Sequence, residues 1–144
     1  MHKQNWQISK HKENIEIVSE TYNPFYKSLC SDLGVFINND TYANKTFIDW
    51  NKYENHISFF YDYEGCEIEI RNRLLNSPLI NENNVYLDFG YDGPIIMTDS
   101  NYFIENWYDF IQGAHYETTV ISETGKYILE FVKEGYMLKL DFKA

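Results

Sequence analysis

Apolar residues recur at helical spacing between positions 98 and 113, and they predict one amphipathic helix. At about 100° per residue, the apolar side chains of this stretch share one arc of roughly 120°. They are Phe103, Ile104, Trp107, Phe110 and Ile111. The opposite side is polar, with a tyrosine at each edge, and it holds Asn101, Tyr102, Glu105, Tyr108, Asp109 and Gln112. Thr98, Asp99 and Ser100 are candidate N-caps, and Gly113 is a candidate stop. We expect a core helix with an acidic, tyrosine-flanked outer face.

Three stretches in the C-terminal part of the chain read as strands, and they span 117–122, 126–132 and 136–142. Short connections containing glycine join them, as in hairpins, so they predict an antiparallel meander. In the middle stretch Ile128, Glu130 and Val132 share one face, and Tyr127, Leu129 and Phe131 share the other. In the last stretch Tyr136, Leu138, Leu140 and Phe142 lie opposite Met137, Lys139 and Asp141.

Three further elements are predicted. Asn23 followed by Pro24 predicts the start of a helix over about 24–33, with Gly34 as its stop. Cys30 falls on the apolar side of that helix, so we expect it to be a small buried hydrophobe. Residues 85–89 alternate as a strand, and a turn at 91–94 leads into a second strand at 95–97.

The remaining segments are ambiguous or polar. Residues 15–18 fit a short strand or a turn of helix, and residues 1–14 predict a loosely held start. Residues 46–49 resemble a capping box with Asp49 in place of Glu, which indicates a short helix through Trp50 and Tyr53. Residues 56–63 and 66–71 fit a hairpin closed at Glu64 and Gly65. A helix through Cys66, Ile70 and Leu74 competes with it, and the hairpin is favoured.

Together these patterns predict an α+β fold: a single domain over 1–144, with an antiparallel sheet packed against a few helices. A chain of 144 residues with 44% hydrophobic and 18% aromatic residues is long and apolar enough for one core. It has no apolar run of about 18 residues and no apolar region near its start, so we expect neither a membrane span nor a secretory signal. We expect a cytoplasmic protein in which Cys30 and Cys66 are reduced thiols, rather than a disulfide.

Charge narrows the class of partner. The net charge is −10 and is unevenly placed. Residues 1–56 hold seven acidic and six basic side chains, a net of −1, whereas residues 57–144 hold fifteen and six, a net of −9. Such a field repels nucleic acid and anionic membrane and speeds encounter with a basic partner. The alternative is that the acidity only keeps the protein in solution.

Catalytic signatures are missing from the sequence: it has no P-loop, no dinucleotide-binding glycine pattern, no nucleophile elbow and no Cys-x-x-Cys. The four histidines, His2, His11, His56 and His115, do not stand at metal-ligand spacings. We therefore expect no enzyme, no metal and no cofactor.

Carboxylates beside tyrosines are the candidate contacts for a protein partner. Glu105 and Asp109 lie one helical turn apart, where like charges cost roughly 0.2–0.5 kcal/mol. They are either two solvated charges or a pair whose repulsion a basic partner relieves; a catalytic dyad would need a pocket. Tyrosine is enriched in binding surfaces, where neighbouring acids can pair with Arg or Lys. The predicted contacts are Glu105, Asp109, Tyr102, Tyr108, Asp88, Tyr91 and Asp92.

The region from about 85 to 142 resembles bacterial immunity proteins of contact-dependent growth inhibition and related polymorphic-toxin systems. The resemblance lies in an aromatic helix with a Trp and an Asp-Phe-Ile (101–112), followed by the stretches 117–121, 125–131 and 138–142. It implies a cytoplasmic protein that binds and neutralises one cognate toxin domain, often a nuclease, by occluding its active site or substrate groove. A basic toxin would suit this acidic chain; nucleic acid and membrane are not expected partners.

Two other functions remain open at this point. One is a small-ligand or protein-binding module with an aromatic pocket, which predicts a deep cavity. The other is an acidic mimic of nucleic acid that captures DNA-binding proteins broadly. Against mimicry, the acids here lie among core-like aromatics rather than in long runs.

Overall fold

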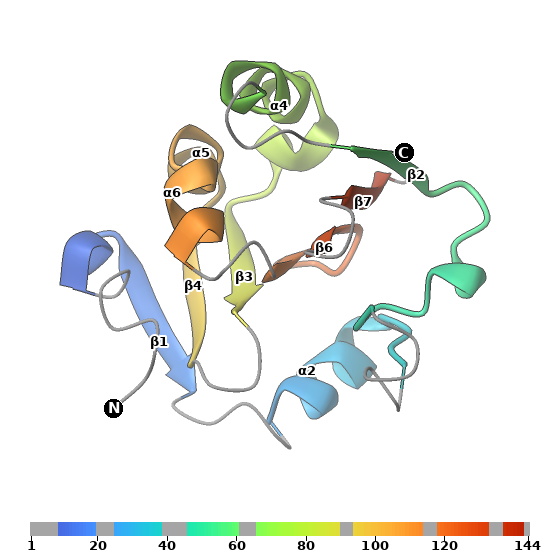
Figure 1. Ribbon diagram of the computed structural model, residues 1–144. Coiled ribbons are helices and arrows are strands. Elements are labelled where there is room, and N and C mark those ends of the chain that lie inside the picture. Colours follow the sequence, from blue (N-terminus) through green and yellow to red (C-terminus); the bar gives the residue numbers. More distant parts are fainter. Residues whose placement is uncertain are drawn as a thin grey trace.

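The structure is a computed structural model that describes residues 9–19, 25–38, 46–60, 66–89, 94–113, 118–132 and 137–142. Its strands form one seven-stranded antiparallel sheet in the order β1-β4-β3-β5-β6-β7-β2 (Figure 1). The strands are β1 (Ile15–Ser19), β2 (Ile57–Phe60), β3 (Asn84–Asp88), β4 (Ile95–Asp99), β5 (Thr118–Ser122), β6 (Tyr127–Val132) and β7 (Met137–Phe142). The helices are α2 (Phe25–Leu33), α4 (Glu67–Leu75), α5 (Ser100–Glu105) and α6 (Trp107–Gly113), with the 3₁₀ helices η1 (Trp50–Lys52) and η2 (Pro78–Asn81). The predicted α+β class is confirmed.

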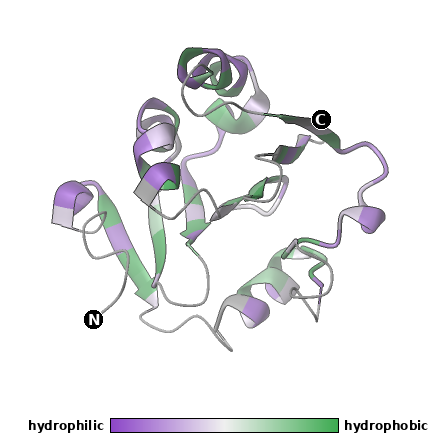
Figure 2. Ribbon diagram, viewed as in Figure 1, coloured by the Kyte–Doolittle hydropathy of each residue, from purple (hydrophilic) through white to green (hydrophobic). Residues whose placement is uncertain are grey.

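Apolar side chains cover both faces of the sheet, and each face carries its own core. On one face, α4, α5 and α6 pack over residues that include Leu87, Val120, Leu129 and Leu138. On the other face, α2 and the segment around η1 pack over Ile95, Ile121 and Ile128. Because adjacent residues of a strand point to opposite faces, β4, β5 and β6 each serve both cores. Figure 2 shows the hydrophobic colour concentrated on the strands, with hydrophilic residues on the outer turns.

The predicted meander from β5 to β7 is confirmed. Leu129 lies opposite Leu140, and Phe131 lies opposite Leu138, in the antiparallel register of β6 and β7. Phe131 also stacks on Trp107 of α6, with ring centroids 5.6 Å apart. The face that Leu129 and Phe131 share is therefore the face that α4, α5 and α6 cover.

The helix predicted over 98–113 forms as two helices that meet at Asn106. The Asn106 N–H donates to the carbonyls of Tyr102 and Phe103, and its Nδ2 donates to the Tyr102 carbonyl at 3.0 Å. A short amide side chain that bonds a nearby carbonyl competes with the helical ladder, which explains the break. Asp99 is the N-cap, because its carboxylate accepts from the Tyr102 N–H at 3.0 Å. The apolar arc survives the break and is fully buried.

The hairpin favoured for 66–71 is wrong, and the competing helix is correct: α4 buries Ile70 and Leu74. Its first turn places two acids at the positive end of the helix dipole, and Arg71 bonds Glu67 one turn back at 2.8 Å. Strand β2 forms as predicted within 56–63, but it pairs with β7 instead of with 66–71. Ile68, which the alternation would bury, is 69% exposed.

The capping box predicted at 46–49 does not form. The Thr46 hydroxyl donates to the Ile48 carbonyl at 2.9 Å, and Asp49, the N-cap of η1, makes no side-chain capping bond. Residues 15–19 form a strand, which settles the earlier ambiguity. The helix predicted at 24–33 is confirmed as α2, and it is followed by Gly34 at a φ of 74°.

The two cysteines, Cys30 and Cys66, are buried and are not joined in a disulfide, as expected. Among the described residues, no helix is long and apolar enough to cross a membrane.

Candidate partner-binding surface

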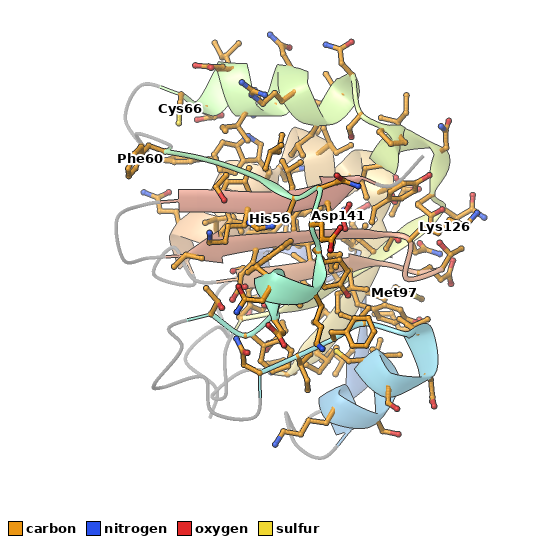
Figure 3. The ribbon with its side chains drawn as sticks, turned by 90° about the vertical axis from the view of Figure 1, so that its right-hand side faces the viewer. His56, Phe60, Cys66, Met97, Lys126 and Asp141 are labelled. Carbon is orange, nitrogen blue, oxygen red and sulfur yellow. The ribbon has the colours of Figure 1, made fainter. Side chains whose placement is uncertain are left out.

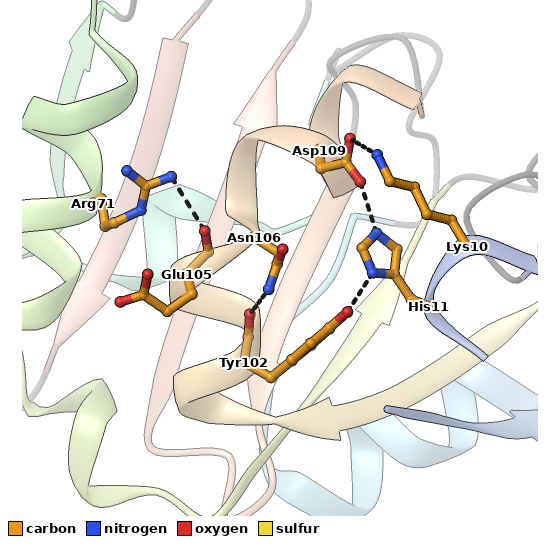
Figure 4. Close-up of polar contacts among 7 residues, drawn as sticks. All are labelled: Lys10, His11, Arg71, Tyr102, Glu105, Asn106 and Asp109. Carbon is orange, nitrogen blue, oxygen red and sulfur yellow. Dashed lines mark hydrogen bonds and ion pairs between the residues drawn. The ribbon is translucent and has the colours of Figure 1, made fainter. Parts of the chain in front are cut away.

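The predicted contact residues fall into three groups. Tyr102 and Glu105 of α5 and Tyr108 and Asp109 of α6 follow one another along the chain, but Tyr102 and Asp109 point toward Lys10 and His11, whereas Glu105 lies on the side of Arg71 and α4 (Figure 4). Asp88, in β3, is only 3% exposed, so it offers almost no surface to a partner in this conformation. Tyr91 and Asp92 lie outside the described residues.

Asp109 is not a solvated charge: the N-terminal segment neutralises it. Lys10 Nζ lies 2.9 Å from Asp109 Oδ1, and His11 Nε2 lies 2.7 Å from Asp109 Oδ2 (Figure 4). The Asp109 side chain is 26% exposed. The interpretation of Glu105 and Asp109 as two solvated charges therefore fails for Asp109. Its charge already has cationic or hydrogen-bonding partners within the chain.

His11 anchors the same segment from inside the fold. Its side chain is 3% exposed, and its Nδ1 lies 2.5 Å from Tyr102 Oη. The imidazole packs against the Phe110 ring at a centroid distance of 4.4 Å. A neutral imidazole that donates from Nε2 to Asp109 and accepts at Nδ1 from the Tyr102 hydroxyl gives both ring nitrogens of His11 a hydrogen-bonding partner. The expectation of a loosely held start is wrong for residues 9–14.

The same chain of groups resembles a general-base arrangement, in which a carboxylate orients a histidine toward a hydroxyl. Here, however, the imidazole is buried, and the Tyr102 hydroxyl is already its partner. This arrangement joins β1 and its preceding turn to α5 and α6. In the described ranges no three His, Cys, Asp or Glu side chains cluster so that they could hold a metal ion.

Glu105, in contrast, presents its charge to solvent. Its side chain is exposed, and within the described ranges its carboxylate forms neither a hydrogen bond nor an ion pair. The Glu105 carbonyl accepts from Arg71 Nη2 at 3.1 Å, while the same nitrogen bonds Glu67 at 2.8 Å. Arg71 thereby ties α4 to the end of α5 without reaching the Glu105 carboxylate.

Helix α4, which packs against α5 and η2, carries exposed apolar residues. Ile68 is 69% exposed and Leu75 is 38% exposed, and their spacing of seven places them on one stripe of the helix. Arg71 lies between them in sequence. We call Ile68, Arg71, Leu75 and Glu105 the α4–α5 surface. It combines two exposed apolar side chains with a carboxylate that forms no ion pair with any residue the structure describes.

Tyr108 follows Glu105 by three residues in the sequence, and its side chain is half-buried. Its ring meets Trp107 edge-on, with centroids 5.5 Å apart and an interplanar angle of 74°. Trp107 in turn donates from Nε1 to the Glu67 carbonyl of α4 at 3.1 Å. Tyr108 is thus held in place by the core and keeps part of its ring exposed.

One buried charge on the other face of the sheet was not singled out from the sequence. Glu130 of β6 is 6% exposed and accepts from three donors of the η1 segment. They are Phe47 N at 2.6 Å, Ile48 N at 3.2 Å and Trp50 Nε1 at 2.8 Å. Burial raises the pKa of Glu130 from 4.5 to about 7, against the lowering effect of these donors and of Lys139. The sequence feature that could have identified Glu130 is its position in β6 on the same face as Ile128.

The sequence matches no protein-family model, and a search of curated proteins finds no similar chain.

Proposed function

We propose that this protein binds and neutralises a cognate basic toxin domain, and that the α4–α5 surface is part of the contact. The observation that carries the proposal is the exposed carboxylate of Glu105, which forms no ion pair with any described residue, together with the exposed apolar side chains of Ile68 and Leu75 on the neighbouring helix α4. The resemblance of residues 85–142 to immunity proteins supplies the biological role.

Electrostatics supports a basic partner. The chain carries a net charge of −10, and the acids of residues 57–144 account for most of it. Internal pairing removes Asp109 from this field, whereas Glu105 stays available at the surface. An exposed acid of this kind raises the association rate with a basic protein and makes that rate sensitive to salt.

The apolar stripe supports direct contact with the partner, in addition to the electrostatic attraction that speeds association. Interfaces place apolar side chains at their centre and polar ones at their rim. Ile68 and Leu75 would supply the centre, with Glu105 and the exposed part of Tyr108 beside them. Tyr102 and Asp109 act in this proposal as internal supports of α5 and α6, because the N-terminal segment covers them. Tyr91 and Asp92 stay predicted contacts.

The test begins with affinity capture by the tagged protein in lysate of its own strain, at about 150 mM salt. The expected result is one stoichiometric partner of toxin size, whose growth arrest this protein relieves on co-expression. Capture of many basic proteins at low occupancy would favour nucleic-acid mimicry. No capture while the partner is expressed would favour a ligand-binding module.

A matched pair of charge reversals then tests the surface. Glu105→Lys should slow association with the captured toxin at least tenfold at low salt, and the difference should shrink as salt rises. Asp32→Lys is the control, because Asp32 is also exposed, lies on α2 over the other face of the sheet, and changes the net charge equally. Equal association rates for the two variants would remove Glu105 from the interface.

A further inference from the structure

Strand β2 ends the sheet. It pairs with β7 on one side, with Ile57 opposite Leu140 and Phe60 opposite Met137. Within the described ranges no strand pairs with its other side. A terminal strand presents N–H and C=O groups that can pair with a strand from another chain.

This edge strand is only four residues long, but it carries neither the charge nor the proline that commonly blocks strand addition. Proteins commonly place charges or proline on exposed edges, but Ile57–Phe60 reads Ile-Ser-Phe-Phe. Phe60 is 74% exposed and Ile57 is 48% exposed. Figure 2 colours β2 as hydrophobic, and Figure 3 shows Phe60 at the outer margin of the ribbon, near the start of α4.

We propose that the outer edge of β2 binds an extended segment of a basic partner protein, which adds a strand to the sheet. This rests on the proposed function in one respect: the partner is basic. It adds the mode of binding, because backbone pairing at β2 is a contact distinct from the α4–α5 surface.

The positions of the exposed side chains define the segment that fits. Ile57 and Phe60 are three residues apart, so they point to opposite faces of the sheet. An added strand would therefore meet an apolar side chain on each face and needs apolar residues at its own centre. A helix would satisfy neither the backbone groups of the edge nor both faces.

Charge distinguishes a basic partner from a second copy of this chain. Exposed Glu54 precedes β2, and exposed Glu69 lies in the first turn of α4, where Glu67 is already paired with Arg71. Two copies that met at this edge would bring these acids together, and each copy carries a net charge of −10. Basic residues at the ends of an added strand would instead face acids.

The experiment uses the full chain and a synthetic probe, acetyl-KKVTIVTKK-amide. Binding is followed by backbone amide NMR shifts and by hydrogen exchange at residues 57–60. We expect saturable shifts centred on β2 and at least tenfold slower exchange of its outward amides. The acidic counterpart, acetyl-EEVTIVTEE-amide, should produce neither effect.

Two double variants locate the site. Ile57→Lys with Phe60→Lys should weaken binding of the basic peptide at least tenfold. Ile17→Lys with Phe36→Lys is the control: it adds the same charge at other exposed apolar positions, Ile17 being on the edge strand at the opposite end of the sheet. Equal weakening in both would mean that charge alone governs binding, and it would overturn the proposal.

Three other outcomes would also overturn it. They are shifts confined to the α4–α5 surface, equal binding of the acidic peptide, and protection of β2 by dimerisation without any peptide. None of them depends on Glu105. If Glu105→Lys still slows toxin association in that case, the proposed function stands and only strand addition at β2 falls.

Discussion

His11 Nε2 lies 2.7 Å from Asp109 Oδ2, and this contact joins two residues that are 98 positions apart in the sequence. It fixes the N-terminal segment to α6, while His11 Nδ1 and Tyr102 Oη fix the same segment to α5. The sequence predicts that the acidic face of this helix contacts a basic partner. Part of it is instead occupied by basic and hydrogen-bonding groups of the chain itself.

Replacing His11 by Ala should therefore destabilise the fold. The change removes a buried ring that packs on Phe110 and leaves Tyr102 and Asp109 without one partner each. We expect the free energy of unfolding to fall by about 2–4 kcal/mol, measured by urea unfolding followed by tryptophan fluorescence. Lys10→Ala is the control: Lys10 is 56% exposed, so its ion pair contributes at most about 1 kcal/mol. Equal losses in the two variants would contradict an anchoring role for His11.

The Glu130 carboxyl predicts an unusual dependence of stability on pH. Its pKa in the folded protein is about 7, above the ordinary 4.5, so the folded state holds this proton more tightly than the unfolded chain does. This tighter proton binding stabilises the folded state in full below pH 4.5, and the stabilisation is lost as pH rises through 7. The loss amounts to up to roughly 3 kcal/mol.

Glu130→Gln should remove that dependence, since an amide does not titrate in this range. The measurement is the free energy of unfolding from pH 4.5 to 8 for both proteins. The wild type should lose stability relative to the variant as pH rises. Parallel curves would show that Glu130 keeps an ordinary pKa in the fold.

The parts of the fold that could be predicted from sequence are those decided locally. Strand β7 alternates over its six residues, which fits no helix, and β6 is a short run rich in aromatic and β-branched residues between two glycine-containing connections. Residues 66–71 alternate only three times, and Cys66 and Ile70 satisfy both periods. The choice there depends on packing of Ile70 and Leu74 against the sheet, which no local pattern encodes.

The candidate site was predictable only in part for the same reason. Its helix face and Glu105 follow from periodicity. The contact of His11 with Asp109 spans 98 positions and has no local signal. The place of Glu130 on the Ile128 face could be predicted, but its backbone donors could not, because the segment that supplies them, at Phe47 and Ile48, lies 82 to 83 positions away.

The turn between β5 and β6 should be sensitive to a single added carbon. Gly125 has a φ of 80°, and a Cβ on it would lie 2.6 Å from the Leu33 carbonyl oxygen at the end of α2. Gly34 has a similar φ of 74°, but a Cβ there would meet nothing within 4 Å. Both alanine variants carry a backbone cost of about 1–2 kcal/mol, because their φ is positive.

Gly125→Ala should cost at least about 1 kcal/mol more than Gly34→Ala, because the backbone of Leu33 must shift as well. Thermal and urea unfolding of the two variants measure the difference. Equal losses would mean that the turn and the end of α2 separate without cost, so that α2 contributes little at this contact.

Substitutions at Asp109 and Glu105 should affect different properties: the stability of the fold at Asp109 and binding of the partner at Glu105. Asp109→Asn removes the charge that Lys10 and His11 face, and we expect a loss of about 1–3 kcal/mol in the free energy of unfolding. Glu105→Gln removes an exposed charge that forms no ion pair with any described residue, so the free energy of unfolding should change by less than about 0.5 kcal/mol. Association with the basic partner proposed above should show the reverse order: slower for Glu105→Gln, and near wild type for folded Asp109→Asn. Urea unfolding and stopped-flow association on the same samples would test both halves. A larger association defect in Asp109→Asn would mean that the partner displaces the N-terminal segment and binds Asp109 itself.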